Sequence, residues 1–419
     1  MPTDDFFYYK KDQLYCEGVK VRDLVEKFGT PLYVTSKNAI VSQYQRFEKA
    51  FKSLNHLTCY SVKANYTLAV LRTLVREGSG FDVNSGGELF RALKAGAKPK
   101  RIIFAGVGKT KDEIEFAIES KVLFQKVESL SELHLINKLA KKLKRVAPIA
   151  IRINPNVTAE THPYITTGND EKKFGIDERL AEEAFETLDK LKYLKFVGLQ
   201  MHIGSQILDT QFYLEALFKL LGVKAIAESK GFQVKYLDIG GGFPITYRTE
   251  QPAPDIEIFA EKLIPLLKNQ SVQILFEPGR FIVGNASVLV TEVLYRKQNH
   301  RGKNFVIVDA AMTELMRPML YEAYHEILPV EQKEREIIIA DIVGGVCESG
   351  DFFALDREIA EVKEGERLAI FSVGAYGIVM SSNYNARLKP AEVMVSGKKA
   401  TLIRKRETYK QLIQNEEIS

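Results

Sequence analysis

Residues 57–65 read Leu-Thr-Cys-Tyr-Ser-Val-Lys-Ala-Asn, a short β-rich run that ends in a lysine, an alanine and an asparagine. Seven similar runs follow, and most of them precede a stretch with apolar residues three and four positions apart. The eight runs are Leu57–Asn65, Gly80–Ser85, Arg101–Gly106, Val122–Val127, Ala147–Pro155, Phe196–Ser205, Val234–Phe243 and Val272–Arg280. Eight β/α units over roughly 250 residues predict a TIM barrel, whereas a doubly wound sheet would need only about five or six strands.

The pattern changes after Gly284, where strand-like runs follow one another without helices between them. These runs are Ser287–Lys297, Lys303–Ala310, Glu336–Val343, Arg367–Val373, Ala391–Val395 and Ala400–Lys405. They predict a C-terminal all-β domain, either a barrel or a sandwich. The first 35 residues contain little helical pattern and precede the barrel. We therefore predict a barrel domain over 36–284 and a β domain formed by 285–419 together with 1–35.

Composition excludes several classes of protein. The chain has 59 basic and 54 acidic residues spread along its length, so no basic stripe indicates nucleic-acid binding. Its three cysteines, Cys16, Cys59 and Cys347, are too scattered for a disulfide framework and indicate a reducing compartment. No apolar run has membrane length, and the N-terminus lacks a signal-peptide pattern. We expect a cytoplasmic protein with a small-molecule substrate.

Four of the predicted strands end in residues that can do chemistry. The first ends at Lys63, the sixth at His202–Ser205, the seventh at Gly240–Gly242 and the eighth at Glu277–Arg280. Each also has an ordinary interpretation, because most lysines are solvated, a lone histidine is usually structural and three glycines can form a tight turn. A TIM barrel places its catalytic residues at these strand ends, so their convergence on one mouth favours a functional role.

The glycines point to a cofactor. Backbone N–H groups near Gly241 and Gly279 can approach an anion closely, and TIM barrels often bind phosphate after strands seven and eight. A phosphate site opposite a lysine indicates pyridoxal 5′-phosphate held by Lys63 as a Schiff base. Glu277 can then face the pyridine nitrogen, and His202 can stack on the ring.

Together these motifs resemble a known family. They are Tyr60-Ser61-Val62-Lys63-Ala64-Asn65, Phe81-Asp82-Val83-Asn84-Ser85-Gly86-Gly87-Glu88, His202-Ile203-Gly204-Ser205, Gly240-Gly241-Gly242-Phe243 and Glu277-Pro278-Gly279-Arg280. In this order they resemble the alanine-racemase-fold decarboxylases that use pyridoxal phosphate, and within that family the diaminopimelate decarboxylases. The resemblance runs from about Gly29 to about Arg404.

The resemblance implies roles for the barrel residues. Lys63 would carry the cofactor and His202 would stack on it. Ser205, Gly241 and the backbone near Gly279 would bind the phosphate. Glu277 would contact the pyridine nitrogen, and Arg280 would contact substrate.

The resemblance also implies roles for the β domain. Tyr376, in Gly374-Ala375-Tyr376-Gly377, would touch cofactor and substrate, and Cys347 would be the proton donor. In this family the Cys347 segment reaches the active site of the other subunit, which implies a homodimer. Gly345 stands where the family usually has proline. The segment His162–Gly175 resembles a mobile loop that closes over substrate.

Charge argues for one substrate among several. Arg280 and Arg317 can bind a carboxylate, Glu348 can receive an ammonium, and Tyr321 can add a hydroxyl. A substrate whose distal end carries both a carboxylate and an ammonium would bind all of these residues. Such a substrate is meso-2,6-diaminopimelate, and its decarboxylation would yield L-lysine. The alternatives are a related decarboxylase for ornithine, arginine or carboxynorspermidine, and a non-catalytic relative that binds a partner protein. For Arg317 the ordinary interpretation is a surface ion pair.

Overall fold

The computed structural model describes residues 5–157 and 173–418, which form two compact units. The barrel unit contains Gln43–Pro244 and Ala253–Ile282, and the β unit contains Met1–Ser42, Ile245–Pro252 and Val283–Ser419. Most of the predicted closing segment His162–Gly175 lies outside the described residues. The predicted boundaries at 36 and 284 stay a prediction for domains that fold independently.

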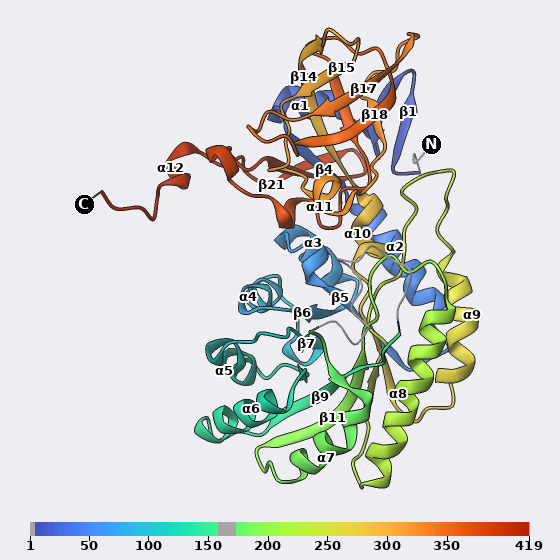
Figure 1. Cartoon of the computed structure of the whole chain (residues 1–419), viewed down its shortest axis with the longest axis vertical. Helices are drawn as coiled ribbons and strands as arrows, with labels where there is room; N and C mark the ends of the chain where they lie inside the picture. The colour runs from blue at the N-terminus through green and yellow to red at the C-terminus, as the bar shows by residue number, and fades with distance from the viewer. Residues whose placement is uncertain (1–4, 158–172, 419) are drawn as a thin grey trace. The chain divides into compact units, whose positions relative to one another are not determined.

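The barrel unit is built on eight parallel strands (Figure 1). They are β5 (His56–Ser61), β6 (Gly80–Val83), β7 (Ile102–Phe104), β8 (Phe124–Val127), β9 (Ala147–Asn154), β11 (Leu194–Met201), β12 (Tyr236–Asp238) and β13 (Gln273–Phe276). Each pairs with the next in chain order, β13 pairs with β5, and this last pairing closes the ring. A short strand, β10 (Ile176–Asp177), adds to β9 outside the ring. The predicted TIM barrel is therefore confirmed.

Helix α2 precedes β5, and each barrel strand is followed by a helix. The helices are α2 (Lys37–Ala50), α3 (Leu68–Arg76), α4 (Gly86–Lys94), α5 (Lys111–Ser120), α6 (Leu130–Lys142), α7 (Ala181–Asp189), α8 (Gln211–Ser229), α9 (Ile256–Leu267) and α10 (Arg280–Val283). Several begin at a side-chain cap. Ser85 accepts the Glu88 N–H at the start of α4, and Thr110 with Glu113 forms a capping box for α5.

The β unit contains a small hairpin sheet and a nine-stranded sheet. Its elements are β1 (Phe7–Lys10), β2 (Gln13–Cys16), β3 (Val19–Lys20), α1 (Val21–Phe28), β4 (Leu32–Ser36), β14 (Ser287–Gln298), β15 (Asn304–Val308), α11 (Arg317–Tyr321), β16 (Ile327–Pro329), β17 (Ile337–Val343), β18 (Phe352–Ala360), β19 (Arg367–Ile370), β20 (Ala391–Ser396), β21 (Lys399–Arg404) and α12 (Tyr409–Leu412). The large sheet runs β18-β17-β15-β14-β4-β20-β21, with β19 beside β14 and β16 beside β19. The predicted C-terminal β domain is confirmed as a mostly-sheet domain, but the expectation of no helices was wrong, because α11 lies between β15 and β16 and α12 follows β21.

Strand β14 organises the core of the β unit because its side chains alternate between two faces. Leu289 and Val293 belong to one buried cluster, while Val288 and Val290 belong to another that includes residues of β1, β2, α1 and β4. The N-terminal segment therefore completes the second cluster.

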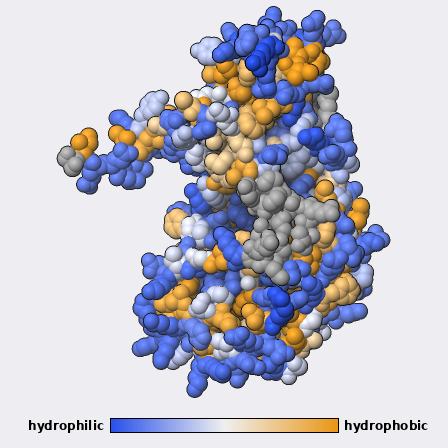
Figure 2. Space-filling model, viewed as in Figure 1, coloured by the Kyte–Doolittle hydropathy of each residue, from blue (hydrophilic) through white to orange (hydrophobic). Residues whose placement is uncertain are grey.

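The surface is mainly hydrophilic on the face drawn in Figure 2, where hydrophobic side chains form separate patches. Among the described residues, no helix combines the length and hydropathy that a membrane crossing needs.

Candidate active site

The interior of the barrel changes from apolar to ionic toward the carboxyl ends of its strands. An apolar cluster unites inward side chains of six strands, including Cys59, Phe124, Ala150 and Leu275. Because side chains alternate along a strand, the residue two positions further on also points inward. Those residues are Ser61, Lys126, Arg152 and Glu277, and each is buried. The carboxyl end of the barrel is therefore lined with polar groups.

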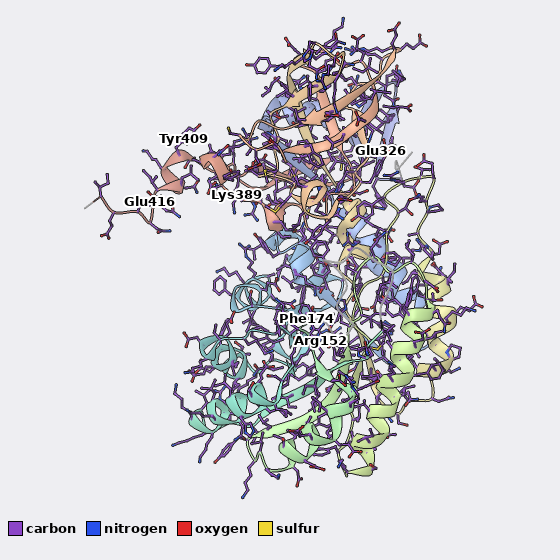
Figure 3. The ribbon with its side chains drawn as sticks, viewed as in Figure 1. Arg152, Phe174, Glu326, Lys389, Tyr409 and Glu416 are labelled. Atoms are coloured by element: carbon purple, nitrogen blue, oxygen red, sulfur yellow. The ribbon has the colours of Figure 1, made fainter. Side chains whose placement is uncertain are left out.

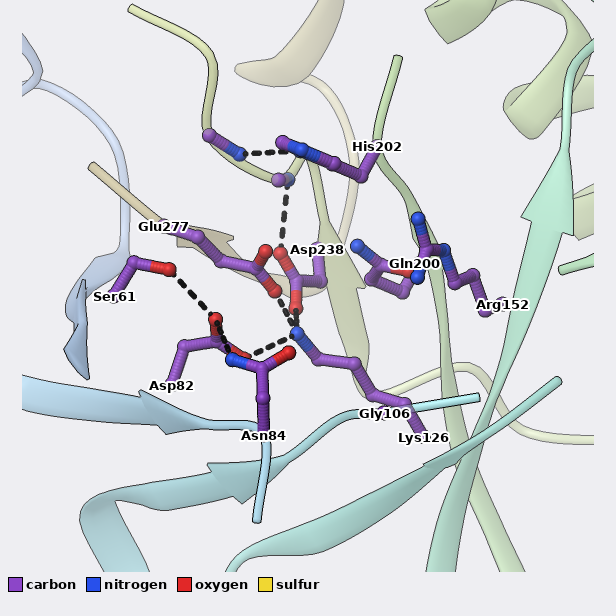
Figure 4. Close-up of polar contacts among 12 residues, drawn as sticks. Ser61, Asp82, Asn84, Gly106, Lys126, Arg152, Gln200, His202, Asp238 and Glu277 are labelled. Atoms are coloured by element: carbon purple, nitrogen blue, oxygen red, sulfur yellow. Dashed lines mark hydrogen bonds and ion pairs between the residues drawn. The ribbon is translucent and has the colours of Figure 1, made fainter. Parts of the chain in front are cut away.

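Lys126 lies at the centre of this polar layer (Figure 4). Its Nζ lies 3.0 Å from Asp82 Oδ1 on β6 and 3.3 Å from Asp238 Oδ2 at the end of β12. It also donates a hydrogen bond to Glu277 Oε1, just after β13. One buried ammonium thus contacts three buried carboxylates from three strands. The sequence-based site included Glu277 but missed the other three, although alternation from Phe124 predicts that Lys126 faces inward.

The two aspartates respond differently to the same lysine. At Asp82, burial raises the pKa, but the charges of Lys126 and Lys63 and two side-chain hydrogen bonds outweigh burial and hold the pKa below its usual value. At Asp238, burial prevails and raises the pKa to about 6, although Lys126 opposes it. Ion pairing therefore dominates at Asp82 and desolvation at Asp238.

Lys63 lies in the 3₁₀ turn η1 (Val62–Ala64), directly after β5. Its amine forms no hydrogen bond or ion pair with any other residue in the described part of the chain, yet its charge acts on Asp82 and His202. Gly279 allows the chain after β13 to lie close to η1 after β5, because a Cβ at Gly279 would lie 3.0 Å from Ala64 Cβ. Lys63 is thus held in the polar layer with its amine available.

His202 presents a neutral ring to the same mouth. Its Nδ1 accepts the Gly241 N–H at 3.2 Å, so the ring proton belongs on Nε2. Burial, followed by nearby positive charges of which Lys63 is the largest contributor, lowers the pKa of the imidazole well below its usual value. A Cβ at Gly240 would lie 2.4 Å from Met201 O, and one at Gly241 would lie 2.2 Å from Glu277 O. Only glycine fits between these strand ends.

A second group of donors fits a phosphate. Arg280 donates from Nε and Nη2 to Ser205 Oγ at 3.3 and 2.9 Å. The N–H groups of Gly242 and Gly279 donate to no residue among those described, although Gly279 is buried. Because buried N–H groups are nearly always paired, these donors indicate an anionic ligand. With the available Lys63 amine and the Glu277 carboxylate, this set fits pyridoxal 5′-phosphate.

Arg152 on β9 extends the polar layer. Its Nη1 contacts both carboxylate oxygens of Glu128 at 3.1 Å, and its guanidinium lies 4.8 Å from the centre of the Phe174 ring (Figure 3). This arrangement keeps the Arg152 side chain fixed within the barrel unit, another feature that sequence reasoning missed.

The remaining predicted residues lie in the β unit, and Arg317 is the most buried of them. It begins α11, is 5% exposed, and lies 4.8 Å from the centre of the Tyr247 ring. His325 Nδ1 contacts the Phe371 carbonyl at 2.8 Å and must donate to it, so Nε2 accepts from Arg317 Nη1 at 2.9 Å. The interpretation of Arg317 as part of a surface ion pair is therefore wrong.

Cys347 and Glu348 lie in the loop between β17 and β18, and both are exposed. The Asp351 carboxylate holds this loop by accepting the N–H groups of Met312 and Val346 at 2.6 and 2.7 Å. A Cβ at Gly345 would lie 3.4 Å from Arg387 Nη1. Crowding therefore does not require a glycine at this position, where the resemblance led us to expect a proline.

Two tyrosines complete the predicted set. Tyr376 follows β19 and has φ +58°, a left-handed conformation that is rare for a bulky residue and often found at functional sites. Tyr321 is the last residue of α11, which Arg317 begins, so one short helix carries both residues.

Comparison with known proteins places the chain in a family. Residues 37–284 match the pyridoxal binding domain of the pyridoxal-dependent decarboxylases. The chain is 48% identical over 409 residues to a diaminopimelate decarboxylase of Aquifex aeolicus, covering 98% of this chain and 97% of that protein. The chain belongs to the diaminopimelate decarboxylase family.

Two solved diaminopimelate decarboxylases are similar, both in complex with L-lysine. The Helicobacter pylori structure has a TM-score of 0.90 at 41% identity and covers 94% of this chain and 98% of its own. The M. jannaschii structure has a TM-score of 0.94 at 39% identity and covers 99% and 98%.

Membership of the diaminopimelate decarboxylase family confirms the predicted family, the decarboxylase activity and the pyridoxal phosphate cofactor. The roles predicted for individual residues stay predictions. Those in the barrel unit are brought together at one mouth. The others occupy three segments of the β unit: Arg317 and Tyr321 lie on α11, Cys347 and Glu348 in the β17–β18 loop, and Tyr376 after β19.

Proposed function

We propose that this chain uses pyridoxal 5′-phosphate to decarboxylate meso-2,6-diaminopimelate to L-lysine and CO2. The observation that carries the proposal is the available amine of Lys63 in a polar barrel mouth, in a chain whose relatives are diaminopimelate decarboxylases. Because the product keeps its L centre, the carboxylate that leaves must come from the D centre of the meso substrate.

The barrel residues bind and orient the cofactor. Lys63 would hold the cofactor covalently through its amine, and Ser205, the backbone around Gly241 with the Gly242 N–H, and the Gly279 N–H would hold the phosphate. Glu277 faces the pyridine nitrogen, and a neutral His202 can stack on the ring without adding charge. When bound, the cofactor withdraws electrons from the carbon that loses its carboxylate.

Substrate selection belongs to the β unit together with Arg280. Arg317 is a buried guanidinium whose orientation His325 fixes, which suits bidentate binding of a carboxylate. Glu348 is exposed and can receive the distal ammonium, while Tyr321 and Tyr376 add hydroxyl groups. Ornithine and arginine carry a distal cation with no carboxylate, so a buried arginine would repel them.

The reaction ends when a proton replaces the carboxylate. We assign this proton to the Cys347 thiol, which is exposed on its loop. An exposed donor can serve a site built by a second copy of the chain, so we propose a homodimer with shared sites. The scattered cysteines further favour a cytosolic location.

One assay tests the proposed function. Purified protein with pyridoxal phosphate should release CO2 from meso-diaminopimelate and form L-lysine in equal amounts. Parallel reactions contain ornithine, arginine and carboxynorspermidine. Release from ornithine alone would refute the substrate assignment, and no release from any of them would favour the non-catalytic alternative.

A further inference from the structure

Lys126 has no assigned role in the proposed reaction, yet it is the most enclosed cation among the described residues of the barrel unit. Its side chain is fully buried and reaches Asp82, Asp238 and Glu277. Burying a charged lysine is costly unless it is paired, and burying three neighbouring carboxylates without a counter-charge is costlier still. The cluster therefore depends on this one side chain.

The three carboxylates do not depend on Lys126 equally. Asp82 Oδ2 also accepts from Ser61 Oγ at 2.8 Å, and Asp238 Oδ1 also accepts the Gly240 N–H at 3.0 Å. For Glu277, Lys126 is the only side-chain partner within the described residues, and it binds Oε1. Oε2 accepts no hydrogen bond from the described chain. Loss of Lys126 would therefore leave Glu277 without a partner.

The net charge of the cluster also indicates that Glu277 depends on Lys126. One ammonium against three ionised carboxylates leaves the cluster with a net charge of about −2, which attracts a cationic ring nitrogen. Five other charged or titratable groups interact with this layer: Cys59 on β5, Lys63 after β5, Glu88 on α4, Arg152 on β9 and His202 after β11. Without Lys126, mutual repulsion would favour protonation of the carboxylates, and a protonated Glu277 could not stabilise a protonated pyridine.

We propose that Lys126 is a positioning residue for the cofactor: its ammonium keeps Glu277 ionised and fixes Oε1, so that Oε2 is presented to the pyridine nitrogen. This inference rests on the proposed function, in which Glu277 faces that nitrogen. It adds a residue on β8 that no motif marks, and it makes the strength of the electron sink depend on a second side chain.

The test replaces Lys126 with methionine, which is similar in length and uncharged. Because Glu277 loses its counter-charge, the Kd for pyridoxal phosphate should rise about tenfold or more, and kcat at pH 7 should fall about tenfold or more. KM should change little, since the substrate residues are elsewhere. The acid limb of kcat should move to higher pH by about one unit, and the absorbance of the bound cofactor should change with pH over the same range.

Rescue separates a charge effect from a packing effect. Adding Asp238→Asn to Lys126→Met removes a competing carboxylate and keeps an acceptor for the Gly240 N–H. The double variant should therefore recover part of the cofactor affinity and move the acid limb back. The control is Lys142→Met on α6, an exposed lysine paired with Glu115, which should match the wild type in every measurement.

Several outcomes would overturn the inference. One is a Lys126→Met protein with unchanged spectrum, cofactor affinity and acid limb, even if its Tm is lower. Another is a double variant that is no better than the single one. If Lys126→Met does not fold, Lys126→Gln is measured instead against the same criteria. A wild-type protein that fails to bind pyridoxal phosphate would refute the proposed function itself, which the variants do not test.

Discussion

Two lysines in one barrel show how surroundings decide the chemistry of a residue. Lys126 Nζ contacts three carboxylates, so its charge is neutralised and its nitrogen is committed to hydrogen bonds. Lys63 lies within electrostatic range of Asp82 but binds no side chain among the described residues. A nucleophilic amine must be accessible and must not be committed to carboxylates, which only the second environment allows.

Replacing Lys63 should therefore abolish covalent attachment of the cofactor. Lys63→Ala should still bind pyridoxal phosphate through its phosphate donors, but the absorbance of lysine-bound cofactor should be absent and decarboxylation should fall to background. Absorbance spectroscopy and CO2 release measure the two effects. Lys94→Ala, an exposed lysine on α4, is the control and should behave like the wild type. A normal spectrum for Lys63→Ala would mean that another lysine holds the cofactor.

Asp82 and Asp238 give opposite predictions for stability. The folded-state pKa of Asp238 is about 6 against an ordinary 3.8, so the folded protein retains a proton that the unfolded chain loses between about pH 4 and 6. The free energy of unfolding therefore falls as pH rises through that window. The folded-state pKa of Asp82 is lowered, so its contribution is stabilising above the unfolded pKa and is lost as the pH falls through the folded one.

At pH 7, Asp238→Asn should therefore stabilise the cofactor-free protein by about 1 to 3 kcal/mol, and by less at pH 5. Asp82→Asn should destabilise it at pH 7. Urea unfolding of both variants at the two pH values measures the free energies. Changes of the same sign in both variants would contradict this account of the cluster.

At the scale of elements, the mouth of the barrel depends on close contact between the ends of β12 and β13. A Cβ at Gly241 would lie 2.2 Å from the Glu277 carbonyl oxygen, so Gly241→Ala must move one strand end and with it Glu277. We expect cofactor affinity to fall about tenfold or more, which corresponds to about 1.4 kcal/mol of lost binding energy. Fluorescence titration with pyridoxal phosphate provides the measurement.

Gly222 supplies the matched control for this prediction. It lies inside α8, and a Cβ there would meet nothing within 4 Å. Gly222→Ala should keep the wild-type affinity and stabilise the protein by about 0.5–1 kcal/mol, because alanine favours helix. Equal affinities for the two variants would show that the strand contact at Gly241 is not what holds the site.

The barrel was predictable from sequence because each of its strands is a compact β-rich run followed by a helix. Six strands of the β unit were not predicted, namely β1, β2, β3, β4, β16 and β18, and two of them show the reason. In β18 the residues Asp356 and Arg357 interrupt the apolar pattern, and Asp356 has φ +45° where the pairing with β17 shifts register. Strand β4 is buried on both faces between β14 and β20, so its five residues show no alternation, and α2 follows it without a loop.

The site residues that belong to a motif at the end of a strand were predictable. Lys126, which belongs to no such motif, was missed. Lys63, His202 and Glu277 stand in recognisable motifs, whereas Lys126 is a single charged residue in an otherwise uncharged strand. Its inward direction depends on the register of β8, and its partners come from strands far apart in the sequence. Alternation identifies the inward position, but only the closed ring brings the three carboxylates to it.

At the scale of the whole molecule, the predicted site residues are divided between the two units of one chain. Lys63 belongs to the barrel unit and Cys347 to the β unit, where its loop is exposed. If Cys347 serves the site of a second copy, each site takes Lys63 from one subunit and Cys347 from the other. Two variants that are each defective can then restore one another.

Mixed dimers test this arrangement. Lys63→Ala and Cys347→Ala proteins are unfolded and refolded together, so that random pairing makes half of the dimers mixed. Each mixed dimer then has one site with both residues intact, and activity should recover to roughly one quarter of the wild type. Lys63→Ala mixed with the double variant is the control, because it contains no intact lysine. If both residues served the site of their own subunit, no mixed dimer would have an intact site. Activity would then stay at the sum of the separate variants, and the shared-site proposal would be wrong.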